Sequence, residues 1–164
     1  MKVLKPPTRI DDALFRDKYS VFLAGSIEMG EASNWQQEIE SALAGVNCVV
    51  FNPRRDDWDS SWAQSIDNAQ FRNQVEWELT ALEKADLIAM YFDPLTKSPV
   101  SLLELGLFAR SGKMLVCCPD GFWRKGNVDI VCHNYMVGSP PNLARLIQRV
   151  VEEARLGKNR PVAS

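Results

Sequence analysis

Residues 86–109 read DLIAMYFDPLTKSPVSLLELGLFA, and this stretch decides the fold class. Its first part, 86–92, is a short apolar run with the length of a buried strand, and the Asp-Pro pair that follows begins a turn. The apolar pattern resumes after Ser98, a residue type that often precedes a helix, and Pro99, which suits the first helical position. The stretch therefore predicts a strand, a loop and a helix over 98–109.

One carboxylate, Glu104, lies inside the predicted helix. The residues three and four positions away on either side carry no positive charge, so no cation of the same helix can pair with it. A carboxylate among apolar groups is costly to ionise, and its pKa tends to rise. An Arg or Lys from elsewhere in the chain, or water at the helix edge, could equally meet it, and the local pattern leaves this open. Gly106 weakens a helix and suggests that another group approaches closely there.

The rest of the chain repeats this alternation of strand and helix. Short runs rich in Val, Ile and Leu predict further strands at 19–24, 47–51, 113–118 and 127–132. Further helices are predicted at 32–43, 67–84 and from 139 onward. Such alternation is typical of an α/β protein, and it predicts a single doubly wound domain of the flavodoxin or Rossmann type, with roughly five parallel strands flanked by helices.

The predicted helix 67–84 carries two lines of residues at helical spacing. One is apolar and is expected to face the core, and the other is polar and consists of Gln74 and Glu78. The apolar line is formed by Phe71, Val75, Leu79 and Leu82. The polar line could be an ordinary solvated face or part of a site. Around this domain, at 19–156, we expect an N-terminal arm at 1–18 and a flexible tail at 157–164.

Composition narrows the function class. A chain of 164 residues with a net charge of -2 suits one globular domain and lacks the basic surface that binds nucleic-acid polymers. No apolar run reaches about 18 residues and no secretory signal is recognisable, so we expect neither a membrane span nor export. Of the four cysteines, two are adjacent, and there is one histidine. This predicts buried thiols in a cytoplasmic protein and no metal site.

Polar and aromatic loops follow the predicted strands at one edge of the sheet. They cover residues 25–27, 52–55, 93–98 and 120–123. Ligands of open α/β sheets bind at this edge. The candidate binding residues there and nearby are Gly25, Ser26, Ile27, Asn52, Arg54, Arg55, Trp58, Gln74, Asp93, Ser98, Trp123 and Asn127.

Several of these candidates have an ordinary structural alternative. The Gly25-Ser26 turn could bind a phosphate or sugar oxygen, or simply cap a helix. Arg54 and Arg55 could clamp a phosphate or carboxylate, or pair with the aspartates that follow them. Tryptophans such as Trp123 could stack on a base or pack in the core. The sequence pattern leaves each of these choices open.

Two carboxylates, Glu104 and Glu78, suggest a reaction. A pair of carboxylates suits cleavage of a glycosidic bond through a covalent glycosyl-enzyme, in which one attacks the anomeric carbon and the other manages protons. This chemistry needs neither metal nor cofactor.

At this point the sequence resembles the nucleoside 2-deoxyribosyltransferase family, including its deoxynucleotide N-hydrolase relatives. The resemblance rests on Phe22-Leu23-Ala24-Gly25-Ser26-Ile27, on Glu78 eight residues before Asp86 of an Ala-Asp-Leu-Ile run, and on Ser98 followed by Glu104-Leu105-Gly106. It implies that Glu104 is the nucleophile attacking C1′, that Glu78 acts near the sugar, and that Ser26 and Ser98 line the sugar or its 5′ side.

The resemblance also implies an enzyme of nucleoside salvage whose catalytic domain binds a nucleoside or nucleotide and a free nucleobase. It further implies a homo-oligomer, a dimer or higher, in which Trp123 or Asn127 could act across an interface. The sequence departs from the family at three positions. Glu78 and Ser98 each replace an Asp, and Glu28 stands where the hydrolase branch has an Arg for the 5′-phosphate, which favours nucleosides over nucleotides.

The sequence therefore leaves three functions open. The first is N-glycosyl transfer on 2′-deoxynucleosides by double displacement through a covalent glycosyl-Glu intermediate. The second is N-glycoside hydrolysis of (deoxy)nucleoside 5′-monophosphates. The third is a non-catalytic sensor that binds a nucleoside or nucleotide on the same scaffold.

Overall fold

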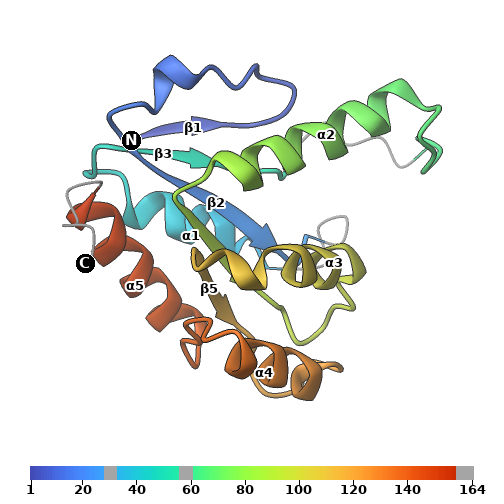
Figure 1. Cartoon of the computed structure of the whole chain (residues 1–164), viewed down its shortest axis with the longest axis vertical. Helices are drawn as coiled ribbons and strands as arrows, with labels where there is room; N and C mark the ends of the chain where they lie inside the picture. The colour runs from blue at the N-terminus through green and yellow to red at the C-terminus, as the bar shows by residue number, and fades with distance from the viewer. Residues whose placement is uncertain (28–32, 56–60, 158–164) are drawn as a thin grey trace.

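The computed structural model describes residues 1–27, 33–55 and 61–157. Within them, a five-stranded sheet has the order β1-β3-β2-β4-β5, and every neighbouring pair is parallel (Figure 1). The strands are β1 (Lys2–Leu4), β2 (Tyr19–Gly25), β3 (Cys48–Phe51), β4 (Leu87–Tyr91) and β5 (Met114–Cys117). The predicted doubly wound α/β fold is confirmed.

Helices cover both faces of the sheet (Figure 1). Residues of α1 and α5 share one apolar core with the sheet, and residues of α2, α3 and α4 share the other. The helices are α1 (Trp35–Ala42), α2 (Ala69–Lys84), α3 (Pro99–Phe108), α4 (Lys125–Asn134) and α5 (Leu143–Leu156). All four cysteines are free and buried, as predicted. Among the described residues, none of the helices combines the length and the apolar character that a bilayer crossing needs.

The position of the fifth strand was predicted wrongly. It is β1, at Lys2–Leu4, which pairs with β3 from within the segment that the sequence indicated as an arm. The predicted strand at 127–132 is instead part of α4. A three-residue strand is too short to show a period, and in α4 the buried Val128 and Cys132 are four residues apart, which is a helical spacing. The β-branched residues between them suggested a strand that the spacing does not support.

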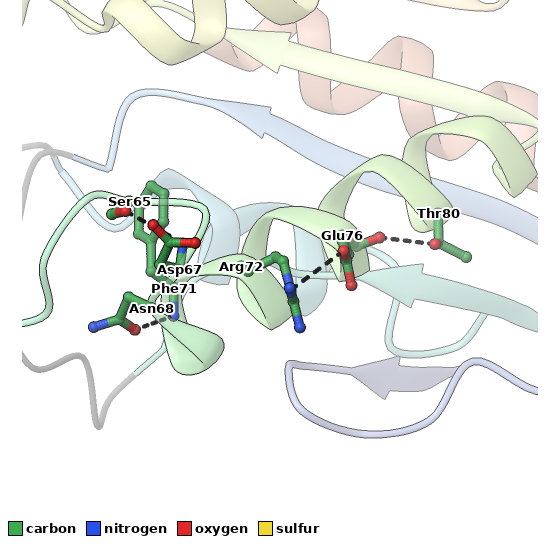
Figure 2. A network of polar contacts seen from close by, with 7 residues as sticks. All are labelled: Ser65, Asp67, Asn68, Phe71, Arg72, Glu76 and Thr80. Carbon is green, nitrogen blue, oxygen red and sulfur yellow. Dashed lines mark hydrogen bonds and ion pairs between the residues drawn. The ribbon is translucent and has the colours of Figure 1, made fainter.

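The rotation of α2 about its axis also differs from the prediction. Trp77 and Ala81 face the sheet together with Gln74 and Leu82, whereas Leu79 of the predicted apolar stripe is 40% exposed. Figure 2 shows how the start and the outer face of this helix are held. The Asn68 side chain caps the helix by accepting from the Phe71 N–H at 2.9 Å.

The outer face of α2 carries Arg72, Glu76 and Thr80, four residues apart (Figure 2). Arg72 pairs with Glu76 at 3.7 Å, and the Thr80 hydroxyl donates to the Glu76 main-chain oxygen at 2.7 Å. Gln74 and Glu78 are offset from this line by two positions, or about 200° around the helix. The polar line of Gln74 and Glu78, for which a solvated face was one alternative, therefore lies on the inner side of α2.

One expectation for α3 is not met. A Cβ added at Gly106 would have no atom of the described residues within 4 Å. Close approach of another group of the described residues is therefore not the reason for a glycine at position 106. The glycine lowers the stability of the helix.

The strand order creates a topological switch point between β2 and β4. From β2 the chain crosses to β3 on one side, and from β4 it crosses to β5 on the other. The segments that leave the carboxyl ends of β2 and β4 therefore diverge and open a crevice between them. Gly25 and Tyr91 are register partners at the ends of these strands, so Ser26 and the loop from Asp93 begin at this point.

Candidate active site

Three buried hydroxyl groups meet at the switch point. Ser26 Oγ lies 2.8 Å from Thr96 Oγ1 and 2.6 Å from Ser98 Oγ, and the last two are 2.8 Å apart. Ser26 Oγ also accepts from the Asp93 N–H at 2.8 Å, and Thr96 donates to the Asp93 main-chain oxygen at 2.9 Å. We call these three side chains the hydroxyl cluster. It fastens the segment after β2 to the segment after β4.

Ser98 lies before α3, but its hydroxyl does not cap the helix. The residue has a φ of 45°, in the left-handed region, and its side chain accepts no hydrogen bond from the first turn. Its Oγ belongs to the hydroxyl cluster instead. The helix therefore begins where the sequence predicted, at Pro99, while the serine has a different partner from the one that its position suggests.

Asp93 and Trp35 complete this part of the site as supports. The Asp93 carboxylate accepts from the main-chain N–H of Leu95 at 3.0 Å and from that of Ser33 at 3.2 Å, so it joins the β4–α3 loop to the start of α1. The Trp35 indole donates to the Ser26 main-chain oxygen at 2.9 Å. With both of its oxygens engaged, Asp93 holds loops together.

Glu104 lies on the inner side of α3 and is 9% exposed. Of the residues that the structure describes, none pairs a cation with it or donates a hydrogen bond to it. Burial raises its pKa to about 8, and the negative charge of nearby Glu78 contributes in the same direction. The raised pKa favours the protonated form of this carboxyl group, and no cation of the described residues forms an ion pair with it.

Glu78 lies on the inner side of α2 and is partly buried. Burial raises its pKa to about 7, and a hydrogen bond from Gln74 opposes this rise. Gln74 Nε2 donates to Glu78 Oε1 at 2.7 Å and to the Pro53 main-chain oxygen at 3.2 Å, while Gln74 Oε1 accepts from Arg55 Nη1 at 3.4 Å. The two carboxyl groups thus form an electrostatically coupled pair, and of the two only Glu78 has a hydrogen-bond donor among the described residues.

Asn52 and Arg54 contact α1, on the other face of the sheet. Asn52 donates to Glu40 at 2.6 Å and accepts from the main-chain N–H of Arg54 at 2.9 Å. Arg54 Nη1 donates to Gln36 Oε1 at 3.4 Å. The segment after β3 is therefore fastened to α1 through Asn52 and Arg54, and to α2 through Pro53 and Arg55.

The remaining candidates are less closely connected. The Trp123 indole donates to the Lys97 main-chain oxygen at 2.9 Å, next to the hydroxyl cluster, and its ring is 51% exposed beneath the Arg124 guanidinium. Asn127 is an exposed residue of α4, and no hydrogen bond within the described residues links its side chain to the carboxyl pair or the hydroxyl cluster. Ile27 has no polar contact with another described residue. Trp58 and Glu28 lie outside the described residues.

Two residues of this region were missed from the sequence. Thr96 is 3% exposed and completes the hydroxyl cluster, and its position between Asp93 and Ser98 was the available signal. Gln36 is fully buried, and its Nε2 has no hydrogen-bond partner within the part of the chain that the structure describes. It directly follows the core residue Trp35, in a helical position where a glutamine would normally be exposed, so no signal was available.

The sequence agrees with this geometry. A family model described as "Nucleoside 2-deoxyribosyltransferase like" matches residues 18–122, which include β2, α2, β4 and α3. The chain belongs to this family. The nucleoside 2-deoxyribosyltransferase-like match thus covers both carboxyl groups and the hydroxyl cluster, and it confirms the resemblance that the motifs indicated.

A solved structure shares the fold. The CMP N-glycosidase BcmB of Clostridium botulinum superposes with a TM-score of 0.50 at 14% sequence identity, over 82% of this chain and 99% of that chain. At this identity the similarity extends to the fold. No curated protein matches the sequence.

Proposed function

We propose that the protein catalyses N-glycosyl transfer on 2′-deoxynucleosides through a covalent glycosyl-Glu104 intermediate. The observation that carries this proposal is the coupled pair of carboxyl groups, Glu104 and Glu78, on the inner sides of two helices that meet the sheet near its carboxyl edge. Membership of the nucleoside 2-deoxyribosyltransferase-like family supports it. A buried carboxylate without a cation is what a glycosyl nucleophile needs, because no ion pair weakens its attack.

The reaction has two steps. In the first, the ionised Glu104 attacks C1′, the base departs with the electron pair of the C–N bond, and Glu78 supplies a proton to it. In the second, a new base attacks C1′, Glu104 leaves as a carboxylate, and the proton from the acceptor nitrogen returns to Glu78. No atom changes oxidation state over the cycle. The hydroxyl cluster, the Gly25-Ser26-Ile27 segment and Trp123 would bind the sugar and the base.

Hydrolysis of (deoxy)nucleoside 5′-monophosphates is the second candidate. It uses the same first step. In the second step, water takes the place of the acceptor base. The shared fold with a protein described as a CMP N-glycosidase favours it. So do Arg54 and Arg55, whose guanidinium groups near the strand ends suit a phosphate.

A product assay distinguishes these functions. Each of the four 2′-deoxynucleosides is incubated with a different free base, in parallel with its 5′-monophosphate and with CMP, and products are separated by chromatography. We expect a new deoxynucleoside containing the added base, and we expect no product from Glu104→Gln. Free base and sugar alone would indicate hydrolysis, and release only from monophosphates would favour the second candidate. If no product forms while both proteins still bind nucleosides, the result would contradict both enzymatic functions and favour a non-catalytic sensor.

We also propose that the protein is a homo-oligomer formed through α3. Val100, Leu103 and Leu107 are 60%, 64% and 58% exposed, and their spacing puts them on one outer side of the helix. This apolar stripe lies on the helix that carries Glu104. A second copy covering it would therefore bury the outer face of the catalytic helix.

Leu103→Glu is expected to dissociate the oligomer, because a charge in the centre of an apolar interface loses its hydration without gaining a partner. Sedimentation velocity of the wild type and the variant measures this directly. Met136→Glu is the matched control, since Met136 is 92% exposed and lies outside α3. A wild-type protein that sediments as a monomer, or equal dissociation by both variants, would contradict the proposal.

A further inference from the structure

The orientation of the Gln74 amide is fixed by the protein itself. The Pro53 carbonyl can only accept a hydrogen bond and the Arg55 guanidinium can only donate one, so they determine which end of the amide is nitrogen. The remaining N–H then points at Glu78. Gln74 is 5% exposed, and both of its N–H groups have protein partners. The amide therefore has no N–H group left for a ligand, although the sequence made it a candidate for substrate binding.

The orientation of the Gln74 amide affects Glu78 and Glu104 differently. An N–H donor at 2.7 Å stabilises the ionised form of Glu78. Glu104 has no such donor among the described residues, and an ionised Glu78 opposes its ionisation. The charged groups of the described residues that belong to this cluster are the two carboxyl groups and Arg55, which reaches the pair through Gln74. Burial raises the pKa of both carboxyl groups; the hydrogen bond from Gln74 opposes this rise at Glu78, and the charge of Glu78 adds to it at Glu104.

We propose that Gln74 is a positioning residue that decides which of the two carboxyl groups ionises first. By donating to Glu78, it keeps that carboxyl group ionised and leaves the proton of a singly ionised pair on Glu104 in the ligand-free protein. The two groups titrate as a coupled pair, and Gln74 sets the order in which they ionise.

The consequence for catalysis rests on the proposed function. Glu104 can attack C1′ only after its proton has left. A bound nucleoside that draws Glu78 away from Gln74 and toward its base would make Glu78 the stronger proton acceptor. One proton would then move from Glu104 to Glu78, which leaves an ionised nucleophile and a protonated acid from the same transfer. The substrate would thus activate its own nucleophile.

Carboxyl ¹³C NMR titration of protein labelled at glutamate tests the inference without substrate. The proteins are the wild type, Gln74→Met and the matched control Gln70→Met, which removes an exposed glutamine one turn earlier in α2. Spectra of Glu78→Gln and Glu104→Gln assign the two signals. In Gln74→Met we expect the titration midpoint of Glu78 to rise by about one pH unit, the value of a charge-assisted hydrogen bond, and that of Glu104 to fall. Gln70→Met should leave both midpoints unchanged.

The opposite directions separate this role from a merely structural one. A variant that only loosened the site would admit water and lower both midpoints toward the ordinary range of a glutamate. Lowering of both, unchanged midpoints in Gln74→Met, or equal effects of the two variants would overturn the inference. If Gln74→Met does not fold, Gln74→Leu is judged by the same outcomes. Since no turnover is measured, failure of the inference and failure of the proposed function are distinguishable.

Discussion

Glu104→Gln is expected to lose turnover by about 10⁴-fold or more and, at the same time, to melt at a higher temperature than the wild type. Loss of turnover follows if Glu104 is the covalent nucleophile that we propose. The gain in stability follows because the glutamine has nearly the same shape but never ionises in its buried position. Few substitutions of a catalytic residue separate the two effects so clearly.

The size of the stability effect depends on pH. The pKa of Glu104 is about 8 in the fold, above the 4.5 of an ordinary glutamate. The folded state therefore favours the protonated form, and the stability that this provides is complete below about pH 4.5 and is lost as the pH rises through about 8. At pH 8 we expect Glu104→Gln to be more stable by about 4 kcal/mol, or about 8–16 °C in Tm. At pH 4.5 the difference should vanish.

Thermal melts of both proteins across this pH range measure the effect. Glu76→Gln is the control, because Glu76 is on the exposed face of α2 and its replacement should change stability by less than about 0.5 kcal/mol. A Glu104→Gln protein that is less stable than the wild type at pH 8 would mean that the fold stabilises the carboxylate, and the description of the site would be wrong.

Gly25→Ala is expected to have the largest effect on folding. Gly25 ends β2 with a φ of 129°, which side-chain-bearing residues rarely adopt. A Cβ would lie 2.1 Å from the main-chain oxygen of Tyr91, its partner on β4. That oxygen also accepts from the Ser26 N–H at 2.9 Å, so relief of the clash separates the strand ends and displaces Ser26. We expect a loss of about 3–5 kcal/mol, or no folded protein.

Urea denaturation of Gly25→Ala beside Gly45→Ala tests this. Nothing described lies within 4 Å of a Cβ added at Gly45, so that variant should stay close to the wild type. Equal stabilities of the two variants would show that the end of β2 is not held against Tyr91, and that the hydroxyl cluster does not depend on this close approach.

The sequence predicted those features that repeat over many residues. Strand and helix alternation and the lack of a cation near Glu104 on its own helix depend on local spacing and local composition, so they could be predicted. The rotation of α2 could not, because Phe71 and Val75 are as apolar as core residues and only packing against the sheet selects Trp77 and Ala81 instead.

The sequence predicted which polar residues belong to the site, but it did not predict the hydrogen bonds between them. Gln74 and Glu78 were identified by spacing, yet the contact that orients the Gln74 amide comes from Pro53, 21 residues earlier in the chain. The hydroxyl cluster joins residues about 70 positions apart. Connections of this range depend on the strand order, and no local pattern encodes them.

If the 5′ end of a substrate lies at the hydroxyl cluster, as the resemblance implies for Ser26 and Ser98, a count of hydrogens there bears on what that end can be. The Thr96 hydrogen goes to the Asp93 carbonyl, which can only accept. The Ser26 and Ser98 hydroxyls contribute two hydrogens, whereas the three contacts within the cluster call for three donors. Among the contacts that join these three side chains to one another, one therefore lacks a hydrogen. A phosphate, which only accepts at its ionised oxygens, would have to break one of these contacts to receive a bond. A 5′-hydroxyl could instead supply the hydrogen that the cluster lacks.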